Sequence, residues 1–561
     1  MARKLVNLTT LIASVLRMTS PAVSRCCQPK CRRNVLGLLL VVAAGVVYLT
    51  YTTTNSSIQP VAFIQRPDFV SEAEITSDVY NLDPLLCANA TLSFMFLEGE
   101  GQRTTYNAGE RIKVKVQLFD GYGLPKKRGG DLVRIWLRDL AESACSAGHV
   151  TDNKDGTYTG VLRAAWAGQP EVIASIAGPR ESLKILYKVF DDHKTIKHIN
   201  AIFAVEEEDL EVEESPCLPF PEVPGYRKVC NFTAENYGLP WYCGEPRSIN
   251  ITCFDWIQIV VHDNAGHLPL TKAEKVIIER NNHSQLRTRL VVTIHVDESD
   301  SSSDPDNFIP CNQRPMIDTW GDVSPVGFFH KWTWVPAACK VTIDTVDHYE
   351  GCLRNRRLLI YGDSTTRQWF VHFRKLLKLK MASQMFEDGQ PWHKPCLAVN
   401  TVHNYSVFWG PHELPFYGGP NRGFNRPTYV YLDELPNHSR DIVIIHYYLH
   451  FVSFHPSVFT RHIRRLYQSV ESLVSRAPNV TVAIKGPHAM QDLPGRLDDY
   501  WGPVYDNIIR DTFQPIMDKV LYLDYWDMTV ASENESLHPN DTIVSNMVHY
   551  MLNMACRKIH L

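Results

Sequence analysis

The first 67 residues of this chain of 561 contain no Asp or Glu, which excludes an acidic or charge-balanced N-terminal segment. All the basic residues there except Arg66 stand ahead of one apolar run: Arg3, Lys4, Arg17, Arg25, Lys30, Arg32 and Arg33. The run, residues 35–51, is uncharged and about as long as the shortest membrane-spanning helix. Positive charge before a span favours a cytosolic N-terminus. We expect a basic cytosolic tail (1–34), a type II signal anchor (35–51) and a luminal body in a Golgi or other secretory membrane; the alternative is a secreted protein.

Signatures of metal and nucleotide sites are also missing. The chain has no HExxH, CxxC, GxGxxG or Walker A sequence, so we expect no metal site and no NAD or ATP chemistry. The formal net charge of −4 does not indicate a nucleic-acid partner. With 44% hydrophobic and 21% charged residues, the composition is that of a globular protein and excludes a disordered, collagen-like or multi-pass membrane chain.

Two features after the apolar run agree with a luminal body. Predicted glycosylation sequons begin at Asn55, Asn89, Asn231, Asn250, Asn282, Asn404, Asn437, Asn479, Asn534 and Asn540. Of the 14 cysteines, 11 follow the run. Disulfides persist in the oxidising lumen of the secretory pathway. Because 11 is odd, we expect one free thiol or a disulfide-linked dimer.

The N-terminal half of the body has the sequence pattern of short β-strands. After a polar stem at 52–84, the segment Arg111–Phe119 alternates apolar and polar residues, and the turn cluster Asp152–Gly156 precedes another strand pattern. We expect an all-β sandwich over 85–197. Cys217, Cys230, Cys243 and Cys253 follow within a predicted Cys-rich, disulfide-stapled connector over 198–311.

From residue 312 to 561 strands alternate with helical patterns. Buried strands are predicted at Leu358–Tyr361, Ile442–Ile445, Val480–Ile484 and Val520–Leu523, and a helix follows the first of them. This alternation predicts an α/β fold with a doubly wound parallel sheet. In such sheets a site forms beyond the carboxyl ends of the strands.

The strongest chemical signal is Gly362-Asp363-Ser364, directly after the first of these strands. A serine at this turn is exposed at the sheet edge, and the amides of the following helix can stabilise an oxyanion. His538 follows the last strand and can act as the base, with Glu535 three residues earlier to support it. Routine helix capping by the serine and a solvated loop histidine are the plainer alternatives.

The sequence around these residues resembles a known family. Trp332-x-Trp334-x-Pro336, Cys339, Cys352-Leu353, the run from Gly362 to Gln368 and the late His538-Pro539 are similar to the PC-esterase branch of the GDSL/SGNH acylesterases. The run VTDNKDGTYTG and Trp166 resemble immunoglobulin-like domains of the filamin type. Together they resemble the neurexophilin and PC-esterase domain (NXPE) family, which implies a neurexophilin-related domain at 85–197 and an SGNH-like domain at 312–561.

The resemblance implies roles for particular residues. Ser364 would be the nucleophile, His538 the general base, and Gly362, Asp363 and Arg367 oxyanion or supporting residues. The family has Asp three residues before the histidine, whereas this chain has Glu535; Asp527 is a substitute. The other oxyanion donors, a Gly and an Asn in SGNH enzymes, have no clear counterpart: Gly410 and Gly418 are the candidates for one, and His450-Phe451 stands where the Asn block is expected.

Two functions remain open at this point. The first is a luminal serine O-acetyltransferase or acylesterase acting on glycans, sialic acids among them, with a donor such as acetyl-CoA in the transfer reaction and no other cofactor. The second is a catalytically silent, neurexophilin-like binding protein with a neurexin-like cell-surface partner.

Overall fold

The computed structural model describes residues 71–99, 103–205, 211–262, 270–279, 284–295, 308–382, 394–412, 426–490 and 500–557. The predicted tail and signal anchor, together with Asn55, Asn282 and Gly418, lie outside these ranges. No helix within them is long and apolar enough to cross a membrane.

The N-terminal half forms two sheets that share one core. The first sheet has the order β1 (Phe94–Leu97), β3 (Arg111–Gln117), β7 (Thr157–Arg163), β6 (His149–Asp152). The second has the order β14 (Ser284–Gln285), β8 (Glu171–Gly178), β4 (Leu132–Asp139), β5 (Ala144–Ala147), β17 (Gly327–His330), β18 (Thr333–Pro336). Alternate residues of β3, such as Ile112 and Val114, meet Val133 and Ile135 of β4. The predicted sandwich and its β6–β7 hairpin are therefore present, while its immunoglobulin-like nature stays a prediction.

The sandwich draws strands from well beyond residue 197. In addition to β14, β17 and β18, the strand β15 (Leu290–Val291) pairs with β8, and β16 (Thr293–His295) pairs with β2 (Thr105–Asn107). The predicted all-β segment also ends in a helix, α4 (Arg180–His193), whose buried Leu183, Leu186 and Phe190 recur at helical spacing. The chain from Ile64 to Leu561 forms one unit.

The second half of the predicted stem belongs to this unit. Helix α3 (Glu72–Thr76) buries Ile75 completely. Asp78 accepts a hydrogen bond from Arg180 Nε at 2.7 Å, and Arg180 is itself buried. From Ser71 onward the segment is therefore packed against α4 and is no polar spacer.

The connector folds as a small antiparallel sheet. Its order is β11 (Val229–Asn231), β12 (Tyr242–Gly244), β10 (Glu211–Leu218), β9 (His198–Val205), β13 (Trp256–His262), and α5 (Lys272–Glu279) follows. Disulfides join Cys217 to Cys243 and Cys230 to Cys253. The predicted disulfide stapling of this segment is confirmed.

The C-terminal half is built on a sheet with a parallel centre. Its order is β20 (Lys380–Met381), β21 (Cys396–Asn400), β22 (Tyr405–Pro411), β19 (Arg357–Gly362), β23 (Ile442–Ile445), β24 (Thr481–Lys485), β25 (Val520–Leu523). The five strands from β22 to β25 run parallel, and β20 and β21 are antiparallel additions. The predicted α/β sheet is present, and β19, β23, β24 and β25 match the predicted segments to within one or two residues, whereas β20, β21 and β22 were not predicted.

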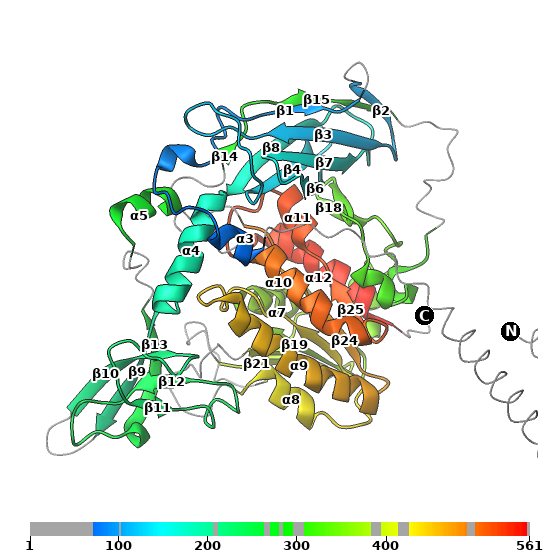
Figure 1. Ribbon diagram of the computed structural model, residues 1–561. Coiled ribbons are helices and arrows are strands. Elements are labelled where there is room, and N and C mark those ends of the chain that lie inside the picture. The colour runs from blue at the N-terminus through cyan, green and yellow to red at the C-terminus, as the bar shows by residue number, and fades with distance from the viewer. Residues whose placement is uncertain are drawn as a thin grey trace, which may run out of the picture. The chain divides into compact units, whose positions relative to one another are not determined.

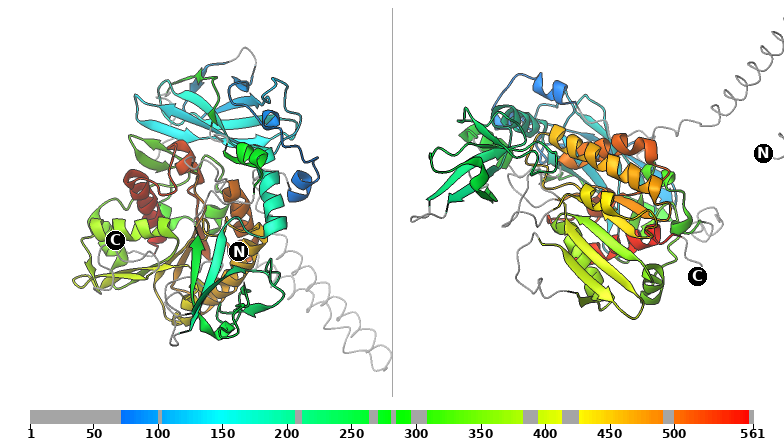
Figure 2. Two further views of the ribbon diagram at one scale, coloured as in Figure 1. Left: turned by 90° about the vertical axis from the view of Figure 1, so that its left-hand side faces the viewer. Right: turned by 90° about the horizontal axis from the view of Figure 1, so that it is seen from below.

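Helices cover both faces of this sheet. Leu359 and Val443 face α8 (Thr428–Glu434), α9 (Pro456–Arg476) and α10 (Trp501–Phe513), which lie side by side (Figures 1 and 2). Leu358 and Ile444 face α6 (Val346–Leu353), α7 (Ser364–Leu376) and α12 (Asp541–Ala555). Strand residues of opposite parity thus serve two separate cores.

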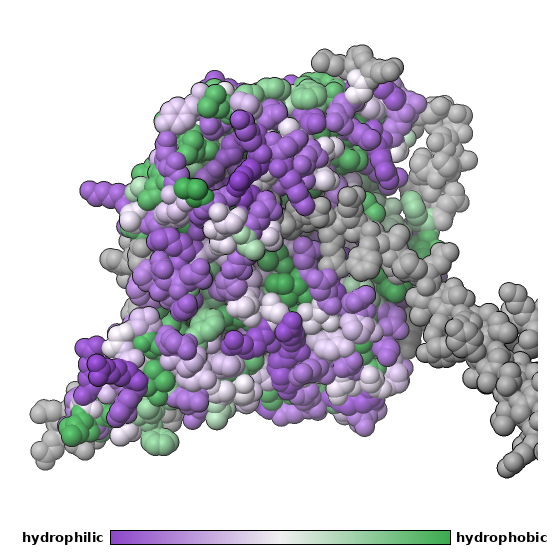
Figure 3. Space-filling model, viewed as in Figure 1, coloured by the Kyte–Doolittle hydropathy of each residue, from purple (hydrophilic) through white to green (hydrophobic). Residues whose placement is uncertain are grey.

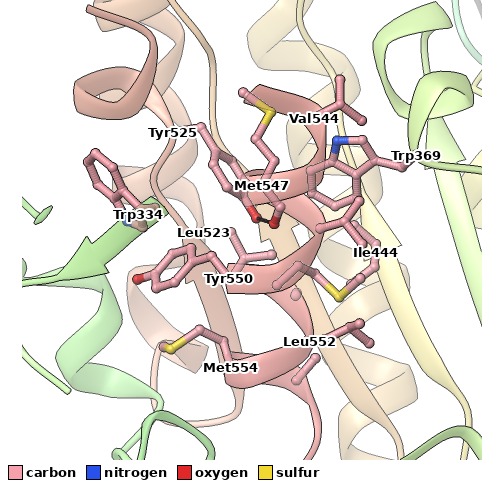
Figure 4. Packing of buried hydrophobic residues seen from close by; sticks show 14 of the residues in the cluster. Trp334, Trp369, Ile444, Leu523, Tyr525, Val544, Met547, Tyr550, Leu552 and Met554 are labelled. Atoms are coloured by element: carbon pink, nitrogen blue, oxygen red, sulfur yellow. Dashed lines mark hydrogen bonds between the residues drawn. The ribbon is translucent and has the colours of Figure 1, made fainter. Parts of the chain in front are cut away.

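The core on the α12 side buries one face of that helix. Met547 and Val544 of α12 lie against Trp369 of α7 and the strand residues Ile444 and Leu523 (Figure 4). The Tyr525 hydroxyl donates to the Met547 carbonyl at 2.9 Å, so its polar atom is satisfied inside this core. On the face shown in Figure 3 hydrophilic residues dominate, as expected for helices whose apolar sides are turned to the sheet.

Disulfides also tie the C-terminal half together. Cys311 is joined to Cys339, and Cys352 at the end of α6 is joined to Cys556 just after α12. The three remaining cysteines after the apolar run, Cys87, Cys145 and Cys396, are outside the four bridges. Cys87 and Cys145 are buried, so among these three only Cys396 is partly accessible for a link between two chains.

We expect the Cys352–Cys556 bridge to contribute strongly to stability because it closes a loop of 204 residues. Replacing both cysteines by alanine should lower the free energy of unfolding by about 2–5 kcal/mol. Urea titration followed by tryptophan fluorescence measures this change. Cys396→Ala is the matched control, and an equal loss in both proteins would contradict the expectation.

Candidate active site

The turn from β19 into α7 presents Ser364 at the carboxyl edge of the parallel sheet. Asp363 caps the helix: its Oδ1 accepts hydrogen bonds from the Thr365 backbone N–H at 2.9 Å and from the Thr365 hydroxyl at 2.6 Å. A side chain at Gly362 would lie 2.6 Å from Thr366 Oγ1 and 3.0 Å from the His446 carbonyl oxygen. The turn therefore requires glycine at 362 and a short acceptor at 363.

The structure brings Ser364 and His538 together across 174 positions of sequence. His538 Nε2 lies 2.7 Å from Ser364 Oγ, which is hydrogen-bond distance for a nucleophile and its base. His538 stands on the loop between α11 (Trp526–Ala531) and α12, and both side chains are half-buried. This pair is the geometric centre of the candidate site.

The start of α7 offers a donor to an oxyanion. The N–H groups of Thr366 and Arg367 donate to the Asp363 carbonyl, and that of Thr365 donates to the Asp363 carboxylate. Within the described residues no acceptor is found for the Ser364 N–H. It is the first N–H of a 13-residue helix, at the positive end of the helix dipole.

The acids predicted to support His538 do not do so. Glu535 is exposed and, among the described residues, makes no hydrogen bond to His538. Asp527 is buried and accepts from the Ser324 hydroxyl at 2.9 Å and the Val326 N–H at 2.8 Å, with its pKa raised to about 6 by burial. Both predictions are wrong, because spacing along the chain does not fix the direction of a loop side chain and Asp527 is committed to the segment before β17.

Asp363 is the acid whose charge acts on His538. Burial lowers the pKa of His538 below the ordinary value and Arg367 lowers it further, whereas Asp363 raises it. The net shift is downward, so the imidazole is neutral near pH 7 and able to accept a proton.

Asp363 itself belongs to a buried polar cluster that the sequence analysis missed. His446 Nε2 lies 3.6 Å from Asp363 Oδ2 and 3.1 Å from Lys485 Nζ, and His488 Nε2 lies 3.2 Å from the Leu537 carbonyl oxygen. All four side chains are at most 1% exposed.

The cluster keeps Asp363 ionised. Burial alone would raise its pKa, but His446, His450 and Lys485 lower it well below the ordinary range. Burial in turn lowers the pKa of Lys485 to about 7 and that of His446 to about 3. The carboxylate therefore stays negative at neutral pH.

A signal for this cluster was present in the sequence. His446 directly follows β23, Lys485 ends β24, and His412 follows β22. Polar residues at the carboxyl ends of successive parallel strands converge on one edge. His450, which stands where the Asn block is expected, lies beside His412 with ring centroids 4.8 Å apart. Gly410, in contrast, packs against the rings of Phe408 and Tyr361.

A cavity of about 650 Å³ opens on the Ser364–His538 pair. One wall is a face of α7 at three- and four-residue spacing, and His538 and Asp541 also line the cavity. The face consists of Ser364, Arg367, Gln368, Val371, His372, Lys375 and Leu376. Arg367 thus lies where the resemblance placed it, beside the serine, and its role stays a prediction.

One predicted glycosylation site is incompatible with the fold. The Asn534 side chain is only 5% exposed, and its Nδ2 donates to the carbonyl oxygens of Ala489 and Ser536, both at 2.8 Å. A glycan on Nδ2 would break both bonds. In contrast, Asn231, Asn250, Asn404, Asn437, Asn479 and Asn540 are exposed, and Asn89 is half-buried.

The comparisons with known proteins fit this geometry. Residues 334–556 match a family model described as the C-terminal domain of NXPE family member 4-like proteins. This part of the chain is similar to the NXPE family. The match covers the α/β sheet and the Ser364–His538 pair.

Two solved structures show a weak likeness to the chain. A GDSL-like lipase from Parabacteroides merdae has a TM-score of 0.23 at 10% identity, covering 38% of this chain and 100% of the lipase. A family two carbohydrate esterase from Cellvibrio japonicus has a TM-score of 0.21 at 9% identity, covering 80% of this chain and 99% of the esterase. At these TM-scores we draw nothing from either structure.

We expect Asn534 to carry no glycan in the folded protein, since its amide is buried and doubly bonded. Glycopeptide mass spectrometry of protein secreted or displayed by cultured cells measures occupancy, with the exposed Asn479 as the comparison site. Occupancy at Asn534 equal to that at Asn479 would contradict the described loop.

Proposed function

We propose that the protein is a serine O-acyl esterase or acyltransferase that acts on hydroxyl groups of glycans in the secretory pathway. The single observation that carries this proposal is the 2.7 Å contact of Ser364 Oγ with His538 Nε2 at the carboxyl edge of the sheet. The unbonded Ser364 N–H and the lowered pKa of His538 agree with it.

The first half of the reaction forms an acyl-serine. Ser364 Oγ attacks the acyl carbonyl carbon while His538 Nε2 takes the hydroxyl proton. The tetrahedral oxyanion lies at the start of α7, where the Ser364 N–H stabilises it. When the bond to the leaving alcohol or thiol breaks, His538 returns the proton to that group, and Ser364 keeps the acyl group as an ester.

The second half regenerates the serine. Water or a sugar hydroxyl attacks the acyl-serine, His538 accepts its proton, and the proton passes to Ser364 Oγ as the ester breaks. Water gives hydrolysis and a sugar hydroxyl gives transfer. Exclusion of water from the cavity decides between the two.

The choice of substrate is part of the proposal. A cavity of about 650 Å³ is in the range that holds a small-molecule ligand, so it has room for a sugar beside Ser364. The sequons and disulfides agree with a protein that meets glycans in the secretory pathway. Acetyl is the proposed acyl group, sialic acids are included among the acceptors, and acetyl-CoA is a donor of the required chemistry.

We expect Ser364→Ala to abolish acyl transfer. Loss of the nucleophile in a working Ser–His site costs several orders of magnitude, up to about 10⁶-fold. Release of nitrophenol from a chromogenic acetyl ester and the acetylation of cell-surface glycans both measure the effect. If wild type and variant act equally in both assays, the binding-protein alternative takes the place of this proposal.

The pH dependence should report His538. The rate rises with pH as the imidazole loses its proton, with a midpoint below the ordinary histidine pKa of about 6.5. Arg367→Met removes a neighbouring positive charge, so the midpoint moves to higher pH. Asp363→Asn removes the acid that favours the imidazolium, so the midpoint moves lower.

A pH series of the chromogenic rate for the three proteins tests these signs. Lys380→Met, which removes an exposed cation from β20, is the control and should leave the midpoint in place. A shift in the same direction for Arg367→Met and Asp363→Asn would contradict the assignment of the midpoint to His538.

A further inference from the structure

Glu533 stands at the start of the loop that carries His538. Its backbone is left-handed, with φ 50°, a conformation that a residue with a side chain adopts rarely. Its carboxylate Oε1 accepts hydrogen bonds from Trp136 Nε1 and Arg138 Nη1, each at 2.9 Å, and Oε2 accepts from Gln285 Nε2 at 3.4 Å. The side chain is 22% exposed, so most of this contact is shielded from water.

All three donors belong to the sandwich. Trp136 and Arg138 are on β4 and Gln285 is on β14, in the sheet that lies next to α11 (Figure 1). Trp136 is fully buried, so its indole N–H has little freedom. Arg138 is also fixed from its other side by Glu171 of β8, at 3.2 Å. Glu533 therefore receives a charge-assisted contact from a rigid surface.

The remainder of the loop is held from the α/β side. Asn534 bonds the Ala489 carbonyl, the Leu537 carbonyl lies 3.2 Å from His488 Nε2, and the Pro539 carbonyl accepts from Gln368 Nε2 at 2.9 Å. Most residues from Glu533 to His538 are thus held by hydrogen bonds, and Glu533 makes the contact with the sandwich. A base displaced by about 1 Å can lose about 10²-fold in rate.

We propose that the sandwich is a working part of the active site, with Glu533 as a positioning residue through which β4 holds the His538 loop. This inference rests on the proposed acyl-transfer function. It goes beyond that function because it assigns a role to a part of the chain that contributes no atom to the Ser364–His538 pair. The C-terminal domain alone would lack one support of its base.

The test uses full-length protein and compares Glu533→Ala with Glu171→Ala. Both variants remove a carboxylate from Arg138, but only Glu533 is on the His538 loop, so Glu171→Ala is the matched control. Glu533→Gln keeps one acceptor oxygen without the charge, and Trp136→Phe removes one donor without emptying the core. Circular dichroism selects a temperature at which all variants are folded.

Two readouts separate positioning from general stability. With the chromogenic acetyl ester, Glu533→Ala should lower kcat by about 10–100-fold with KM within about 2-fold. Glu533→Gln and Trp136→Phe should fall between it and wild type, and Glu171→Ala should stay within about 2-fold of wild type. A folded Glu533→Ala with wild-type kcat would overturn the proposal.

The second readout needs no reaction. Hydrogen exchange of the amides of residues 533–540 should be faster in Glu533→Ala and unchanged in Glu171→Ala. If the wild type proves inactive, the proposed acyl transfer is refuted. If exchange is nevertheless faster in Glu533→Ala, the positioning role of Glu533 is retained. Unchanged exchange in Glu533→Ala would refute the positioning role, whatever the activity of the wild type.

Discussion

The buried carboxylate of Asp363 constrains everything around it. A charge with 1% of its side chain exposed has to be met by donors and cations, and it is met from two directions. Asp363 Oδ1 accepts from the Thr365 N–H at the start of α7, and Oδ2 lies 3.6 Å from His446 Nε2, which itself lies 3.1 Å from Lys485 Nζ. The position of Ser364 and the polar floor of the site follow from this one group, whereas the neutrality of His538 follows from its burial.

The parallel sheet was readable because its strands are short apolar runs with no competing pattern. Residues 442–445 and 520–523 were expected as strands and are strands, since a strand buried on both faces needs an unbroken apolar run. Ser364 was readable for a similar reason, because a serine after Gly-Asp at a strand end has few structural alternatives. His538 was placed by topology, as the histidine after the last strand.

What escaped the sequence analysis depends on side-chain direction and on contacts far apart in the chain. His446 and Lys485 carry a signal only once the order of the strands is known, because each is an ordinary residue at the end of an ordinary strand. For Glu535 and Asn534 the sequence predicted a role that the structure does not support. The spacing of Glu535 from His538 predicted a supporting acid, but the side chain is exposed. The sequon at Asn534 predicted a glycan, but the side chain is buried. The role of Glu533 needed β4 and the loop in one structure, 395 positions apart.

The recruitment of β17 into the sandwich has a consequence for synthesis. β5 ends at Ala147, and the strand that covers its edge begins at Gly327, about 180 residues later. At about 5–20 residues per second the ribosome needs roughly 10–40 s to make that interval. For this time the nascent sheet presents an open edge, which is the kind of surface that pairs with the wrong chain. The protein therefore depends on whatever occupies that edge while its second half is still being made.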